Sequence, residues 1–243
     1  MRRVLSFIFG WCFIIVCVVF SIKSTALNPD FYIPKYEEME LASDIGVSKK
    51  DLNQSIRLLL DYLDDKRDDI KGHITWYGVS QETFNEKETS HMVDVKALYQ
   101  NALKVSKMAF IILVLIVLYF YLNDKTLMFA YLSKGFLMAM FTFILMLVFF
   151  GFWILTDFTS FWTWFHTIFF SNQLWLLDPN TDFMICMLPE TIFYKLVIVC
   201  VVKAICFMAL ASVLAIYYMV KKAPIGFERR LNWHQSLLEE KRY

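Results

Sequence analysis

Glycine is scarce in this chain of 243 residues, with seven copies, and no internal repeat, low-complexity tract or long flexible linker interrupts the sequence. An excess of charge of one sign is also missing, because 24 lysines and arginines stand against 23 acidic residues, for a net charge of +1. A chain with this charge balance has neither a strongly basic surface that could bind nucleic acid nor an acidic tail. Nucleic acid is therefore not expected as a partner.

Cysteine spacing gives no sign of a structural crosslink. None of the five cysteines forms a CxxC pair, which argues against a disulfide framework and a zinc ribbon. Four of them lie inside apolar runs, where cysteine acts as a small, polarizable packing residue. Only Cys186 lies in an expected loop.

Common catalytic motifs are missing as well. The sequence contains no GxSxG, HExxH, SxxK or GxxxxGKS/T pattern. A covalent serine or cysteine mechanism therefore has no support, and neither a metal nor a cofactor is expected.

Apolar residues are abundant, at 58% of the chain, and they gather in four runs. About 20 apolar residues span a bilayer as a helix. The first run is longer than the apolar core of a signal peptide, so we expect a retained anchor. The sequence predicts an all-α integral membrane protein with four transmembrane helices, a small helical extracytoplasmic domain and an interfacial or re-entrant outer helix. The expected transmembrane helices are 1–22, 108–122, 135–155 and 189–220.

Lysine and arginine in the short segments set the expected orientation. They precede the first helix, bracket the loop 123–134 and follow the fourth helix in the tail 221–243. The positive-inside rule puts these segments in the cytoplasm. Residues 23–107 and 156–188 then face outward.

The first helix expected within the outer domain 23–107 is capped by Ser48, with Asp51 three residues later. A second helix is expected to begin near Thr83 and to continue into the second span. On it, His91 shares a face with apolar residues, and Asp94 is close enough to hydrogen-bond its ring. A buried histidine satisfied by Asp94 is the simpler interpretation of this segment.

The second outward segment is aromatic along most of 158–170, with His166 at its middle. Tryptophan and tyrosine favour the membrane–water interface, so an interfacial or partly re-entrant helix is expected. A turn follows at 178–182. The other two histidines, His73 and His234, are expected at the surface.

The segment from Phe165 through Trp175, Asp178, Asp182 and 188–190, together with 91–96, resembles the lipoprotein intramolecular transacylase family. The four-span layout matches as well, so the resemblance covers nearly the whole chain. It implies an acyltransferase of the bacterial cell membrane. The enzyme moves the sn-2 acyl chain of a diacylglyceryl-modified lipoprotein onto the α-amino group of its N-terminal cysteine, giving the lyso-form.

In such a reaction the donor ester and the acceptor amine belong to one molecule, so positioning supplies much of the acceleration and no acyl-enzyme is required. Proton transfer is the chemical task that remains. His91 and His166 are the expected catalytic residues, with Asp94 orienting His91. The residues expected to shape the pocket are Trp175, Asp178 and Asp182. Lipoproteins and membrane lipids are the expected partners.

Two other functions fit the residues. A metal-dependent membrane hydrolase could use both histidines and carboxylates as ligands, and chelation would then abolish activity. A non-catalytic assembly factor would tolerate loss of both histidines.

Overall fold

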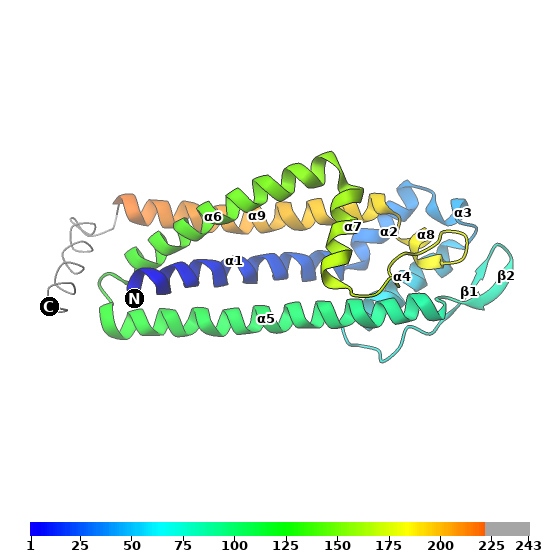
Figure 1. The fold of residues 1–243 in the computed structure, drawn as a ribbon, viewed down its shortest axis with the longest axis horizontal. Coiled ribbons are helices and arrows are strands. Elements are labelled where there is room, and N and C mark those ends of the chain that lie inside the picture. The colour runs from blue at the N-terminus through cyan, green and yellow to red at the C-terminus, as the bar shows by residue number, and fades with distance from the viewer. Residues whose placement is uncertain (222–243) are drawn as a thin grey trace. The chain divides into compact units, whose positions relative to one another are not determined.

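The computed structural model describes residues 1–221, and its regular structure is almost entirely helical (Figure 1). The helices are α1 (Arg2–Ala26), α2 (Pro29–Glu38), α3 (Leu41–Asp44), α4 (Lys49–Leu63), α5 (Glu86–Asp124), α6 (Met128–Thr156), α7 (Phe158–Phe169), α8 (Phe183–Met187) and α9 (Glu190–Lys221). One hairpin joins β1 (His73–Trp76) to β2 (Val79–Glu82).

Four of these helices, α1, α5, α6 and α9, are long and apolar enough to cross a membrane, which confirms the predicted fold class. In α5 a polar first part continues without a break into an apolar part that begins at Met108, as expected. Helix α6 begins at Met128, earlier than the expected start of the third span. The basic residues of the tail after Lys221, and His234 with them, lie outside the described residues.

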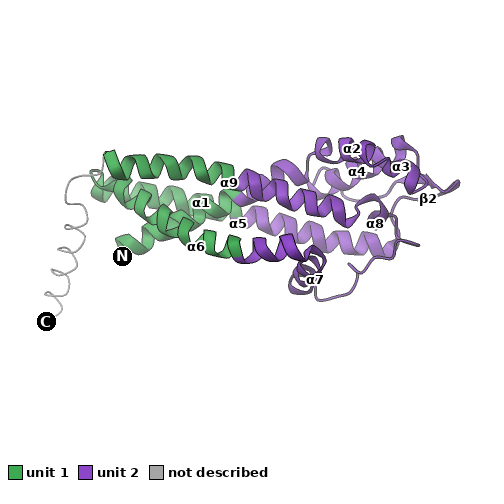
Figure 2. Ribbon diagram, turned by 90° about the horizontal axis from the view of Figure 1, so that it is seen from above, with its two compact units in different colours: residues 1–17, 106–148, 205–243 green, residues 18–105, 149–204 purple. Residues whose placement is uncertain are grey.

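The chain divides into two compact units, coloured in Figure 2. The first contains 1–17, 106–148 and the chain from 205 onward, and the second contains 18–105 and 149–204. In the first unit, α1 and α6 approach closely at small residues. A Cβ added at Gly135 would collide with the backbone oxygen of Ser6, and one at Gly10 would lie 2.6 Å from the Cβ of Ala139. Small residues permit this approach in membrane helices.

The second unit has a core of its own, built from α2, α4, the hairpin, α8 and the start of α9. Helix α4 begins as predicted, because the Ser48 hydroxyl accepts a hydrogen bond of 3.0 Å from the Asp51 N–H. Phe183 of α8 is 1% exposed and packs against the Trp76 ring at 5.5 Å. Burial of such aromatic side chains accounts for much of the stability of a small core.

The sequence analysis missed the hairpin, and it also named no helix at α2, α3 or α8. Tyr77 and Gly78 connect its strands with φ angles of 48° and 81°. A two-residue turn with two positive φ angles matches the twist of antiparallel strands. Tyrosine is an uncommon residue at such a position, and four-residue strands give little periodicity, so the local pattern did not reveal the hairpin.

Candidate functional site

The first histidine is carried by the polar first part of α5, which begins at Glu86 rather than near Thr83. Asn85 and Glu88 form the cap: the Glu88 N–H donates to Asn85 Oδ1 at 3.0 Å, and the Asn85 N–H donates to Glu88 Oε2 at 2.7 Å. This reciprocal pair satisfies two N–H groups that a helix start otherwise leaves unpaired. Asn85 therefore caps the start of α5, two residues after Thr83, where the helix was expected to begin.

His91 is 7% exposed, and its Nδ1 has no hydrogen-bond partner. The expected bond from its ring to Asp94 is wrong. The Asp94 carboxylate instead accepts a hydrogen bond of 2.8 Å from the side-chain amide of Asn172. The Nδ1 atom of His91 is thus buried without a partner, which costs about 1–3 kcal/mol.

The second histidine is carried by α7, whose first turn is capped by Asp157: its carboxylate accepts from the Ser160 N–H at 2.9 Å. His166 is also 7% exposed, and its Nδ1 lies 2.7 Å from the Trp162 carbonyl oxygen. A carbonyl only accepts hydrogen bonds, so Nδ1 carries the proton in this contact. In the neutral ring Nε2 then holds the free lone pair.

The two imidazole rings lie close together although α5 and α7 are far apart in sequence. Their centroids are 6.2 Å apart, with 34° between the ring planes. Phe170 contacts both rings, at 5.2 Å from His91 and 5.5 Å from His166. Trp175 stacks on His166 at 4.9 Å. The arrangement is a pair of buried bases enclosed by aromatic rings.

Burial is the main influence on the protonation of both histidines. Burial is the largest cause at His91, the neighbouring His166 adds to it and Asp94 opposes it, and together they lower the pKa of His91 to about 4. Burial also lowers the pKa of His166, against a raising effect of the Trp162 carbonyl. Both rings are therefore neutral at neutral pH, with lone pairs available to accept a proton.

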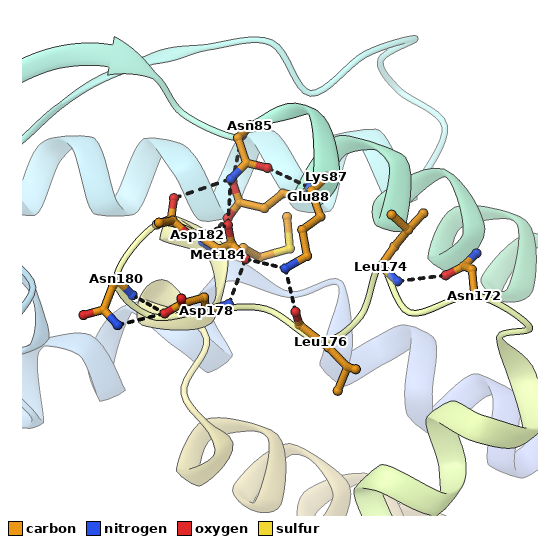
Figure 3. A network of polar contacts seen from close by, with 11 residues as sticks. Asn85, Lys87, Glu88, Asn172, Leu174, Leu176, Asp178, Asn180, Asp182 and Met184 are labelled. Atoms are coloured by element: carbon orange, nitrogen blue, oxygen red, sulfur yellow. Dashed lines mark hydrogen bonds and ion pairs between the residues drawn. The ribbon is translucent and has the colours of Figure 1, made fainter.

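The loop between α7 and α8 is tied to the start of α5 by a second polar cluster, drawn in Figure 3. Its centre is Asp182, which is 2% exposed and accepts hydrogen bonds from Asn85 at 2.8 Å and Lys87 at 3.0 Å. Burial acts to raise the pKa of Asp182, but the N–H and O–H donors around it lower it overall. Asp182 thus anchors the loop that carries Trp175.

Asp178 lies in the same loop and stabilises its turn. Its side-chain oxygen accepts from the backbone and side-chain nitrogens of Asn180, both at 2.9 Å. Its own N–H donates to Asp182 at 2.8 Å. Of the three residues expected to shape the pocket, only Trp175 contacts a histidine ring, and the two aspartates hold its loop.

Glu88 is a site residue that the sequence analysis missed. It is 1% exposed, and besides Asn85 it accepts a hydrogen bond from the Met184 N–H of α8 (Figure 3). Burial raises the pKa of Glu88 to about 7, although these two N–H groups act to lower it. The capping pair with Asn85 was visible in the sequence, but the contact with α8 joins segments that are distant in sequence.

His73 of β1 is exposed, as expected. Within residues 1–221, no group of three or more histidine, cysteine, aspartate or glutamate side chains is arranged to hold a metal ion.

Comparison with solved structures shows the fold. The chain is similar to the membrane integral lipoprotein intramolecular transacylase Lit from Bacillus cereus, with a TM-score of 0.71 and 21% identity over 91% of this chain and 97% of that one. A variant of that enzyme with one histidine replaced by arginine gives a TM-score of 0.68 and 18% identity, over 91% and 93% of the two chains. No curated protein matches the chain at a significant level.

Comparison with family models covers most of the sequence. The model described as lipoprotein intramolecular transacylase Lit matches residues 7–193, which include α5, α7, both histidines and the loop that carries Trp175. The chain belongs to the lipoprotein intramolecular transacylase Lit family.

Proposed function

We propose that His166 moves the proton and His91 stabilises the reacting oxygen when this enzyme transfers the sn-2 acyl chain of a diacylglyceryl lipoprotein to the α-amino group of its N-terminal cysteine. Membership of the family makes the protein an intramolecular lipoprotein transacylase. The observation that carries the division of roles is the pair of buried, neutral imidazoles 6.2 Å apart, only one of which has a fixed hydrogen bond.

The reaction balances within one substrate molecule. A bond forms between the amine nitrogen and the acyl carbon, and the bond between that carbon and the sn-2 oxygen breaks. The nitrogen loses one proton and the departing oxygen gains one, so no water, metal or co-substrate is consumed. Well-oriented groups in one molecule reach effective molarities of about 10⁵–10⁸ M, so positioning supplies much of the acceleration.

His166 is suited to carry this proton. Its Nδ1–H is held by the Trp162 carbonyl, which leaves the Nε2 lone pair to accept the amine proton. The imidazolium that forms lies against the face of Trp175, and an aromatic face stabilises a nearby cation. His166 then gives the proton to the departing sn-2 oxygen, acting first as base and then as acid.

His91 is suited to donate a hydrogen bond. Burial keeps the ring neutral, and its Nδ1 has no protein partner. An N–H at that position can bind the negative oxygen of the tetrahedral intermediate. A donor placed where charge develops lowers the barrier without reorganisation during the reaction.

The proposal also covers the side of the membrane on which the site lies and its contact with lipid. We place the site at the outer face of the bacterial cytoplasmic membrane, because the short segments expected inside carry lysine and arginine, whereas the short outward segment 156–188 carries neither. The exposed face of α7 includes Ile168 and Phe169, at 54% and 50% exposure, which suits contact with lipid acyl chains. Lipoprotein and lipid are thus the proposed partners.

The direct test replaces each histidine by asparagine in the full-length membrane protein. His91→Asn and His166→Asn should each lower the rate by about 10²–10⁴, as expected for removing a general acid–base or electrostatic group. Removing both should cost less than the product of the two effects, because the groups act as a unit. The measurement is mass spectrometry of a lipoprotein N-terminal peptide, reporting lyso-form against diacylglyceryl form.

His73→Asn is the matched control, since His73 is exposed on β1, and it should convert substrate at the normal rate. The proposed mechanism fails if a folded double variant lacking His91 and His166 still produces the lyso-form at a rate close to normal.

A further inference from the structure

We infer that Asn172 is a positioning residue that holds the two catalytic histidines in register, by joining α5 next to His91 to the tryptophan that supports His166. This inference rests on the proposed function. It concerns a residue in the loop that follows α7 (Figure 3).

Three hydrogen bonds define the role of Asn172. Its side-chain Nδ2 donates to Asp94 Oδ2 at 2.8 Å, and its Oδ1 accepts from the Leu174 N–H at 3.0 Å. Its backbone carbonyl accepts from the indole Nε1 of Trp175, also at 3.0 Å. The amide and the carbonyl of one residue thus link α5 to Trp175.

Each end of this connection lies beside a catalytic ring. Asp94 follows His91 by three residues on α5, which is less than one helical turn. Trp175 stacks on the His166 ring at 4.9 Å. His91 Nδ1 has no hydrogen bond of its own, so its position relative to His166 depends on packing and on links such as this one. A shift of about 1 Å between catalytic groups can lower a rate about 10²-fold.

The link can be tested by changing the charge at position 172, because the partner of Asn172 on α5 is the Asp94 carboxylate. Asn172→Asp would set a second carboxylate against Asp94, and like charges at hydrogen-bond distance repel. Because Asn172 is exposed, we expect kcat to fall by about tenfold, the lower end of the range for losing a charged hydrogen bond, while the apparent KM stays constant.

The exchange of both partners is the decisive variant. In Asp94→Asn/Asn172→Asp the amide and the carboxylate trade places, and the contact with Leu174 N–H is retained. We expect kcat to recover to within about threefold of the wild type, a difference smaller than one ordinary hydrogen bond. Recovery shows that the pair acts as a link, because a purely local defect of the loop would remain in the double variant.

Asn180→Asp is the matched control, since its amide donates to Asp178 at 2.9 Å in the same loop but reaches neither α5 nor Trp175. It should reduce kcat less than Asn172→Asp does. The inference is overturned if Asn172→Asp keeps the wild-type kcat, if only its KM changes, or if the exchanged pair does not recover. The His166→Asn variant is assayed beside them: full activity there would refute the proposed function, whereas inactivity there with an active Asn172→Asp would refute the link alone.

Discussion

At the scale of single residues, the site depends on burying two imidazoles, because burial disfavours their charged form. The effect is largest at His91, where burial and the neighbouring ring lower the pKa to about 4 from an ordinary value of 6.5. A depressed pKa favours the folded state above pH 6.5, and that contribution is lost as the pH falls through about 4. The His91 ring is therefore neutral at neutral pH, before substrate binds.

This protonation state can be measured directly. In detergent-solubilised protein carrying labelled histidine, the ring resonances of His91 should stay those of neutral imidazole as the pH falls from neutral to about 5, well above its pKa of about 4. Assignment uses the His91→Asn spectrum. A midpoint for His91 at or above 6.5 would contradict the idea that burial governs this ring.

At the scale of helices, close packing in the first unit depends on one glycine of α6. A Cβ at Gly135 has no room beside the backbone of Ser6 in α1, so Gly135→Ala must push the two helices apart. Overpacking of this kind costs about 1–3 kcal/mol. We expect a lower midpoint of thermal unfolding in detergent for Gly135→Ala.

Gly151 of the same helix provides the comparison. A Cβ there meets nothing within 4 Å. Alanine stabilises a helix relative to glycine by about 0.5–1 kcal/mol, so Gly151→Ala should unfold at the same temperature or slightly higher. Equal losses in both variants would mean that the close approach of α1 and α6 does not contribute to stability.

At the scale of the whole molecule, the proposed function requires the site to face outward. Introduced cysteines test this orientation at Gly72, before the hairpin, and at Asn180, in the loop that precedes α8. Both should react with a membrane-impermeant thiol reagent added to intact cells. The motivation is the placement of lysine and arginine in the short segments between and beyond the spans.

One native cysteine is replaced before this labelling experiment. Cys186 lies in α8 and is partly exposed, so it is first replaced by alanine to remove a native signal. Labelling of Gly72→Cys or Asn180→Cys only after permeabilisation would reverse the topology and put both histidines on the cytoplasmic side.

Much of this protein could be predicted from the sequence because its strongest signals are local. Four apolar runs predicted the four long helices, and Ser48 predicted the start of α4 correctly. His91 was selected because it shares a helix face with apolar residues, and His166 because it lies in the middle of an aromatic stretch. The β-hairpin was missed, since its strands are short and its turn residues uncommon.

The sequence by itself determined which segments are apolar, because hydrophobicity is a local property, and it marked His91 and His166 as candidates from their immediate neighbours. Only the tertiary structure decided the polar partners. Asp94 was assigned to His91 from its spacing, yet it binds Asn172, which lies 78 residues away. Glu88 likewise pairs with Met184 across 96 residues. A carboxylate accepts from whichever donor folding brings within about 3 Å, and sequence spacing specifies that donor only when it is a near neighbour in the same helix or turn.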